Sequence, residues 1–120
     1  NTGMFNDILS RFRSSQSAVV NVAGNEFERL IQEKSDAQLI DVRTPGEFHQ
    51  GHIPGALNYD MYDPAFAGHI EALDRSRPVL LYCRSGSRSY HAGSVLVKLG
   101  FGEVYNLADG LFDWSGALER

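Results

Sequence analysis

Five short apolar runs along the chain are typical of buried β-strands. Each contains about four residues and is rich in Val, Ile, Leu or Tyr, and they cover residues 19–22, 39–42, 56–59, 79–82 and 104–107. Arg43 follows directly after the run that ends at Val42, and the run that ends at Tyr82 leads directly into Cys83. Parallel strands that are buried on both faces often have this pattern. We therefore expect the chemistry of the protein at the ends of these two strands.

Segments with helical spacing of apolar residues lie between the apolar runs. The spacing covers residues 27–31, 66–73, 92–99 and 111–118, and residues 45–48 can form one further helical turn. Strands that alternate with helices predict an α/β fold of three layers, with a central, mainly parallel sheet of about five strands flanked by helices. We expect a short helix over residues 5–13 in an N-terminal extension of residues 1–17, followed by one domain over residues 18–120.

The composition is that of an ordinary globular domain. The 120 residues are 42% hydrophobic and carry a formal net charge of −4, which does not favour a nucleic acid backbone or an anionic membrane surface. No apolar stretch approaches the roughly 20 residues that a membrane-spanning helix needs, and no apolar signal core follows the N-terminus. We expect a cytoplasmic protein with no nucleic acid and no membrane as partner.

The cysteine count restricts the chemistry further. The chain has one cysteine, Cys83, so it forms no intramolecular disulfide and no zinc site with several thiolates. The four histidines show no ligand spacing, and we expect no bound metal. A lone cysteine is by default a small buried apolar residue, so its neighbours in sequence decide whether it is reactive.

Those neighbours form the strongest chemical signal in the chain. A buried strand leads directly into Cys83, small residues follow, and a helix then begins. Backbone amides and two guanidinium groups can converge there on an anion. The same field favours a thiolate, because a cysteine beside arginines at a helix N-terminus can fall from a pKa of about 8.5 to roughly 3.5–7.5. We interpret Cys83 as a nucleophile and the next six residues as its anion-binding loop: Arg84, Ser85, Gly86, Ser87, Arg88 and Ser89.

This loop resembles the active-site loop of the rhodanese family, which has the form C-R-x-G-x-R. Here it reads Cys83-Arg84-Ser85-Gly86-Ser87-Arg88. The family motifs D-V-R, E-F and G-H-I-P-G-A match residues 41–43, 47–48 and 51–56 in the same order, and Leu99-Gly100-Phe101 and Trp114 extend the match. The resemblance covers residues 19–118.

The resemblance implies a sulfurtransferase. The thiolate of Cys83 is expected to attack the outer sulfur of thiosulfate or a related donor, release sulfite, and become a persulfide. Cyanide or an external thiol then removes the sulfur. No metal or organic cofactor is implied. Because the chain has no second cysteine, the thiol acceptor is expected to be glutathione, thioredoxin or another protein.

Three further motif residues are interpreted as structural support of the site. Asp41 and Arg43, at the end of a strand, can pair with each other or with groups of the loop. His52, in a glycine-rich turn, can serve as a hydrogen bonder behind the site, although a purely structural histidine is the simpler interpretation.

Two alternative functions stay open from the sequence. A noncatalytic rhodanese-like module for binding or sulfur sensing is one, although such modules often lack the cysteine. A cysteine-dependent phosphatase or arsenate reductase is the other. Phosphatases of this architecture space the cysteine and the arginine as C-x5-R, whereas Cys83 and Arg88 are spaced as C-x4-R. The shorter loop favours sulfur over a phosphoryl group.

Overall fold

The computed structural model describes residues 18–120, so the helix expected over residues 5–13 lies outside the described residues. Five parallel strands form one sheet in the order β1-β5-β4-β2-β3. The strands are β1 (Val20–Val22), β2 (Gln38–Asp41), β3 (Leu57–Asn58), β4 (Val79–Tyr82) and β5 (Val104–Leu107). The helices are α2 (Gly24–Glu33), α3 (Pro45–Gln50), α4 (Phe66–Glu71), α5 (Ser87–Lys98) and the 3-10 helix η1 (Gly110–Asp113). The predicted α/β fold with a parallel five-stranded sheet is confirmed.

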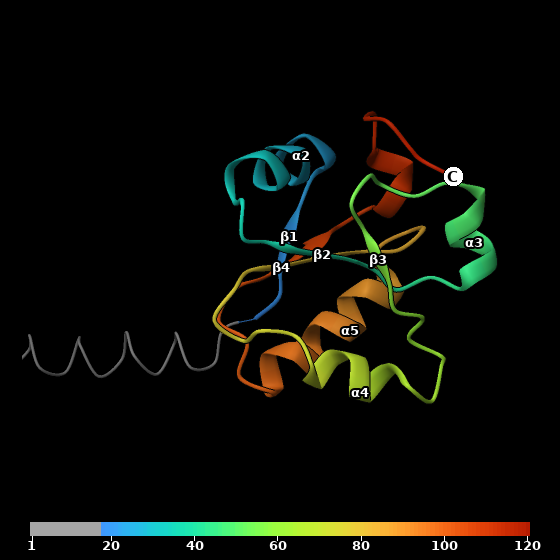
Figure 1. Cartoon of the computed structure of the whole chain (residues 1–120). Coiled ribbons are helices and arrows are strands. Elements are labelled where there is room, and N and C mark those ends of the chain that lie inside the picture. Colours follow the sequence, from blue (N-terminus) through green and yellow to red (C-terminus); the bar gives the residue numbers. More distant parts are fainter. Residues whose placement is uncertain (1–17) are drawn as a thin grey trace, which may run out of the picture.

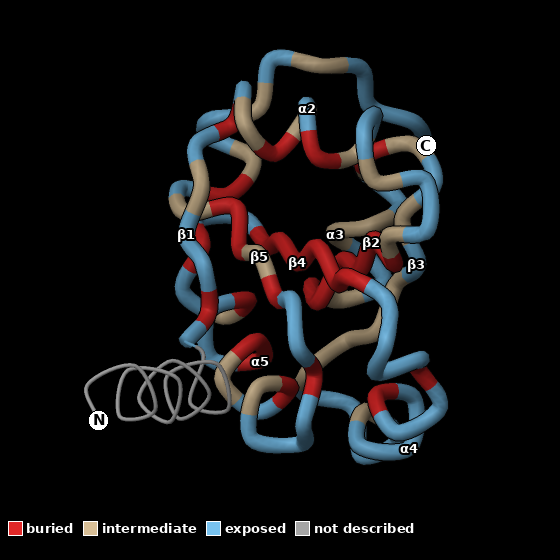
Figure 2. The backbone as a smooth tube through the Cα atoms, turned by 90° about the vertical axis from the view of Figure 1, so that its left-hand side faces the viewer, coloured by how far each residue is buried: buried red, intermediate tan, exposed pale blue. Residues whose placement is uncertain are grey.

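Two apolar cores, one on each face of the sheet, hold the three layers together. Figure 1 shows α4 and α5 on one face, and α2 with the C-terminal segment on the other. Side chains of β4 alternate between the faces: Leu81 packs into the core under α4 and α5, whereas Leu80 packs into the core under α2. All four residues of β2 and of β4 are therefore buried, as the red central tube in Figure 2 shows.

The ends of α2 and α5 depend on different interactions. Gly100 has φ +95° and its amide donates to the carbonyl oxygen of Val97, which ends α5 at the position expected from the sequence. The N-terminus of α2 has no cap from its own flanking residue. Instead, the carboxylate of Asp113 accepts a hydrogen bond of 2.7 Å from the amide of Gly24, 89 residues away in the sequence.

The prediction of a helix over residues 111–118 is wrong. Only the single turn η1 forms, and Trp114 has an extended backbone. The reason is a long-range backbone pair: His52 and Glu119 exchange two hydrogen bonds of 2.8 Å, which uses backbone groups at the end of the segment that a helix would need. Short helices are marginal without tertiary support, so this pairing outweighs the local helical spacing. Leu118, expected on the buried face of the helix, is 51% exposed.

None of the helices in residues 18–120 is long and apolar enough to cross a membrane.

Candidate active site

Cys83 lies in a tight loop that connects the end of β4 to the start of α5. Gly86 shapes this loop: it has φ +98°, and a β-carbon there would lie 1.9 Å from the carbonyl oxygen of Ala108. Only glycine fits such a conformation so close to another backbone. The segment after β5 supports the loop from the other side, because the amide of Leu111 donates to the carbonyl oxygen of Cys83 at 3.2 Å. The segment that follows β5 therefore packs directly against the Cys83 loop.

The sulfur of Cys83 is surrounded by hydrogen-bond donors. The amide of Gly86 donates to it at 3.1 Å, and the hydroxyl of Ser89 lies 3.4 Å away. Burial alone raises the pKa of this thiol, since Cys83 is 0% exposed. The donors outweigh burial, first the Ser89 hydroxyl and then the loop amides, so the pKa of Cys83 is lowered from its ordinary value. The surroundings therefore favour a thiolate.

The arginines of the loop contribute less directly than the sequence suggested. The largest contributions that lower the pKa of Cys83 come from the hydroxyl of Ser89 and the loop amides, not from guanidinium groups. Arg84 is exposed, and its guanidinium lies 5.6 Å from the ring centre of Phe112. Arg88 is half-buried and forms two hydrogen bonds, of 2.8 and 2.9 Å, with the carboxylate of Glu47. In this structure Arg88 is thus neutralised by Glu47, and its role as an anion ligand stays a prediction.

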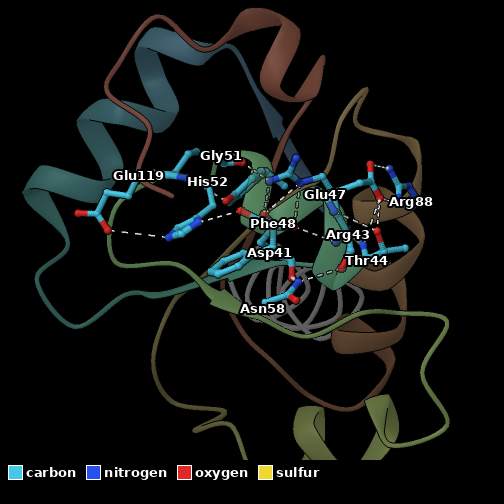
Figure 3. Close-up of polar contacts among 12 residues, drawn as sticks. Asp41, Arg43, Thr44, Glu47, Phe48, Gly51, His52, Asn58, Arg88 and Glu119 are labelled. Carbon is cyan, nitrogen blue, oxygen red and sulfur yellow. Dashed lines mark hydrogen bonds and ion pairs between the residues drawn. The ribbon is translucent and has the colours of Figure 1, made fainter.

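Glu47 connects α3 to α5 beside the loop. Its backbone amide donates to the Thr44 hydroxyl, and its carboxylate accepts from the amide of Thr44, which forms a capping box at the start of α3. The hydrogen bonds from Arg88 are the main reason that the pKa of Glu47 is lowered to about 2. Figure 3 shows both groups of contacts on the one carboxylate. Glu47 therefore fixes the position of Arg88 at the rim of the site.

The acid sensitivity of the fold tests this contact. The pKa of Glu47 lies at about 2 in the folded protein against an ordinary 4.5, so between these values the unfolded state binds more protons. Its stabilising contribution is complete above the ordinary value and is lost as the pH falls towards the folded value. We expect Glu47→Gln to reduce the difference in unfolding free energy between about pH 6 and about pH 3, measured by urea titration.

The matched control for this measurement is Glu33→Gln, which alters an exposed surface ion pair with Arg29. If both variants show the same pH dependence as the native protein, Glu47 does not stabilise the fold through its charge.

Asp41 and Arg43 form a buried ion pair at the end of β2. The guanidinium of Arg43 donates to the carboxylate of Asp41 at 2.7 Å and also to the carbonyl oxygen of Gly51 at 2.7 Å. The amide of Arg43 donates to the same carboxylate at 2.8 Å. Arg43 is 5% exposed and Asp41 is 0% exposed, so each charge is compensated by its partner and not by water. The pair therefore connects β2 to the turn after α3 (Figure 3).

His52 makes contacts on the side of α3 that faces the C-terminal segment. Its ring stacks on the ring of Phe48 with 3.7 Å between centroids, and its Nδ1 lies 3.0 Å from the Phe48 carbonyl oxygen. Its Nε2 lies 3.8 Å from the carboxylate of Glu119. None of these partners belongs to the Cys83 loop (Figure 3). The contacts support the structural interpretation of His52.

The family model of the rhodanese-like domain matches residues 24–117. The chain belongs to the rhodanese-like domain family. A sulfurtransferase from Allochromatium vinosum is 35% identical over 97 residues, which cover 81% of this chain and 89% of that relative. The thiosulfate sulfurtransferase GlpE from Shewanella oneidensis is 32% identical over 101 residues, 84% of this chain and 97% of that relative.

A solved structure supports the fold of this rhodanese-like domain. The crystal structure of a rhodanese-like domain protein from Staphylococcus aureus has a TM-score of 0.73 and 24% identity, and the match covers 84% of this chain and 97% of that one. At this identity the likeness concerns the fold.

A cavity of about 330 Å³ lies beside the active-site loop of the domain. Arg84 and Phe112 line one part of it, and Glu47 lines another. Phe112 is 71% exposed, so the opening has an aromatic edge next to a guanidinium group. A second cavity of about 190 Å³, between α2 and the C-terminal segment, is lined by none of the loop residues. The first cavity is therefore the one that belongs to the candidate active site.

Sequence reasoning did not assign a role to several residues that the structure places at the site. Glu47 had a signal, since Thr44 and Glu47 have the spacing of a capping box. Asn106 also had one, as a polar residue inside an apolar strand. Phe112 had no signal in the sequence, because only the position of η1 in the folded chain places its exposed ring beside Arg84. In the described part of the chain, residues 18–120, no group of three or more His, Cys, Asp or Glu side chains is arranged to hold a metal.

Proposed function

We propose that the protein is a sulfurtransferase in which Cys83 carries a sulfane sulfur as a persulfide. One observation supports this most strongly: the sulfur of Cys83 lies in a loop that donates a hydrogen bond to it from the amide of Gly86 and brings the Ser89 hydroxyl within 3.4 Å. Such donors stabilise both the attacking thiolate and the negative charge of a persulfide. The relatives that are named sulfurtransferases support the same reaction class.

The proposed first step is a displacement at sulfur. The thiolate of Cys83 forms a bond to the outer sulfur of thiosulfate, and the original sulfur–sulfur bond breaks. Sulfite leaves with the electron pair of that bond, and Cys83 becomes a persulfide anion. The guanidinium of Arg84 is exposed and, unlike that of Arg88, is in no ion pair among residues 18–120, so it is suited to attract the anionic donor.

The second step needs an external acceptor. A thiolate attacks the outer sulfur of the persulfide, takes it, and releases the thiolate of Cys83; cyanide does the same and forms thiocyanate. Since the chain has one cysteine, it holds no second thiol for this step. The cavity of about 330 Å³ beside the loop is far larger than one sulfur atom and leaves room for an organic thiol such as glutathione or a side chain of thioredoxin.

The mass of the intact protein tests the proposal. We expect reduced protein to gain the mass of one sulfur atom after incubation with thiosulfate and removal of the excess. Glutathione, thioredoxin or cyanide should then restore the original mass, and their rates would rank the acceptors. If neither thiosulfate nor polysulfide adds sulfur to the folded protein, the proposal is refuted, and hydrolysis of aryl phosphates becomes the next assay.

A further inference from the structure

Asn106 is a buried polar residue directly behind the active-site loop. It lies in β5 and is 1% exposed. Its side-chain nitrogen donates to the carbonyl oxygen of Gly86 at 3.1 Å and to the side-chain oxygen of Asn21 at 3.0 Å. Its side-chain oxygen accepts a hydrogen bond of 2.5 Å from the hydroxyl of Ser89. Asn106 thus contacts both residues that donate to the sulfur of Cys83.

The direction of these hydrogen bonds follows from the partners. The carbonyl oxygen of Gly86 only accepts, so the nitrogen of the Asn106 amide must face it. The oxygen of the same amide then faces Ser89. Because an amide oxygen cannot donate, the Ser89 hydroxyl must be the donor in that contact.

The Ser89 hydroxyl has one proton and three acceptors within reach. The oxygen of Asn106 lies 2.5 Å away, the carbonyl oxygen of Gly86 3.3 Å and the sulfur of Cys83 3.4 Å, so a full hydrogen bond to Asn106 competes with one to the sulfur. When it donates to Asn106, its lone pairs face the sulfur and can accept a hydrogen bond from a protonated thiol. When it donates to the sulfur, it stabilises a thiolate, and the buried oxygen of Asn106 loses its partner.

We propose that Asn106 is a positioning residue that competes with the sulfur of Cys83 for the hydroxyl proton of Ser89. In the resting protein the contact of the hydroxyl with Asn106 is the shorter one, so Asn106 withholds part of the stabilisation that the hydroxyl can give to a thiolate. When charge develops on the sulfur, the hydroxyl rotates and donates more fully to it. Asn106 thereby sets how readily Cys83 becomes nucleophilic. This inference rests on the proposed function of Cys83, but its test does not require sulfur transfer.

The remaining charged groups near the sulfur stay the same in every variant used below. They come from each element around the loop: Arg84 of the loop, Arg88 of α5, Glu47 of α3, Asp41 and Arg43 at the end of β2, and Asp109 after β5. Of these, the positive charge of Arg88 interacts with the charge of Cys83, and Arg88 is itself paired with Glu47. A change in thiol ionisation on substitution of Asn106 is therefore assigned to the Ser89 proton.

Substitution of Asn106 by leucine removes the acceptor with little change in size. It leaves no buried polar group without a partner, because the carbonyl oxygen of Gly86 still accepts from the amide of Tyr90 at 3.1 Å. The Ser89 hydroxyl is then free to donate to the sulfur. Asn21→Ala is the matched control, since it removes the exposed end of the same network and leaves the contact between Asn106 and Ser89 in place.

The measurement is the rate of Cys83 alkylation by iodoacetamide as a function of pH, which reports the apparent pKa of the thiol. A hydrogen bond to a thiolate shifts this pKa by about one unit. We expect Asn106→Leu to lower it, Ser89→Ala to raise it, and Asn21→Ala to leave it unchanged. In the Ser89→Ala background, Asn106→Leu should have no effect, because the contested proton is gone.

Equal shifts by Asn106→Leu with and without the Ser89 hydroxyl would overturn the inference, as would no shift or a raised pKa in the single variant. Asn106→Val, which suits a strand, repeats the test if the leucine variant does not fold. If neither folds, the infrared S–H stretching band decides: it should lie at lower frequency in the native protein than in Ser89→Ala, and equal frequencies would refute the proposal. A confirmed shift without sulfur loading would refute the proposed function alone.

Discussion

Replacement of Cys83 by serine is expected to abolish sulfur transfer. The hydroxyl of serine is neutral at physiological pH and cannot carry a sulfane sulfur, so neither step of the proposed reaction has a substitute. We expect the rate of thiocyanate formation from thiosulfate and cyanide to fall at least about a thousandfold, as it does when an enzyme loses its nucleophile. Intact-mass measurement of Cys83→Ser should show no added sulfur.

Ser115→Ala is the matched control for this variant, because it alters an exposed serine side chain outside the loop. It should retain most of the activity. Thermal unfolding of both variants checks that the fold is intact. Thiocyanate formation by Cys83→Ser at a rate near that of the native protein would show that the reaction does not pass through Cys83.

Removal of the carboxylate of Asp41 is expected to produce the largest loss of stability. Asp41→Ala leaves the guanidinium of Arg43 buried, with the carbonyl oxygen of Gly51 as its remaining partner among the contacts described above. Breaking a buried ion pair on one side costs about 3–5 kcal/mol, a large share of the roughly 5–15 kcal/mol that stabilises a typical domain. Urea unfolding monitored by fluorescence of Trp114 measures the change in the free energy of unfolding.

Two comparisons make this result specific. Glu26→Ala removes a carboxylate from a surface ion pair with Arg29, and we expect a much smaller loss, because solvent screens exposed charges. Asp41→Asn keeps the size and one acceptor oxygen, and should lie between the two. Equal losses for Asp41→Ala and Glu26→Ala would contradict the structural role that we assign to the buried pair. Activity that persists in Asp41→Ala at low temperature would further separate support of the site from a direct catalytic role.

Most of the fold follows from local features of the chain. The apolar runs at residues 79–82 and 104–107 coincide with β4 and β5, and the other three runs agree with observed strands to within one residue at each end. The central strands are recognisable because a strand covered on both faces takes mostly apolar side chains. Gly100 ends α5 for an equally local reason, since the positive φ suits glycine.

The structure of the C-terminal segment could not be predicted from its local sequence pattern. Residues 111–118 have helical spacing, but beyond η1 they form no helix, and Glu119 pairs with the backbone of His52. The carboxylate of Asp113 is used to cap α2 instead of a helix of its own. Both contacts join residues more than 60 positions apart, and no pattern within the segment reports them.

In the candidate site, too, some features can be predicted from the sequence and others depend on tertiary contacts. The position of Cys83, the need for glycine at residue 86 and the expectation of an anion-binding loop can all be derived from consecutive residues, because one short loop contains them. The partners of that loop cannot. Whether Arg88 faces a substrate or Glu47, and whether Ser89 donates to the sulfur or to Asn106, depends on which residues the parallel sheet and its helices bring together. Whether a hydrogen bond forms depends on the positions of donor and acceptor to within a few tenths of an ångström. Between distant segments, those positions are set only in the folded chain.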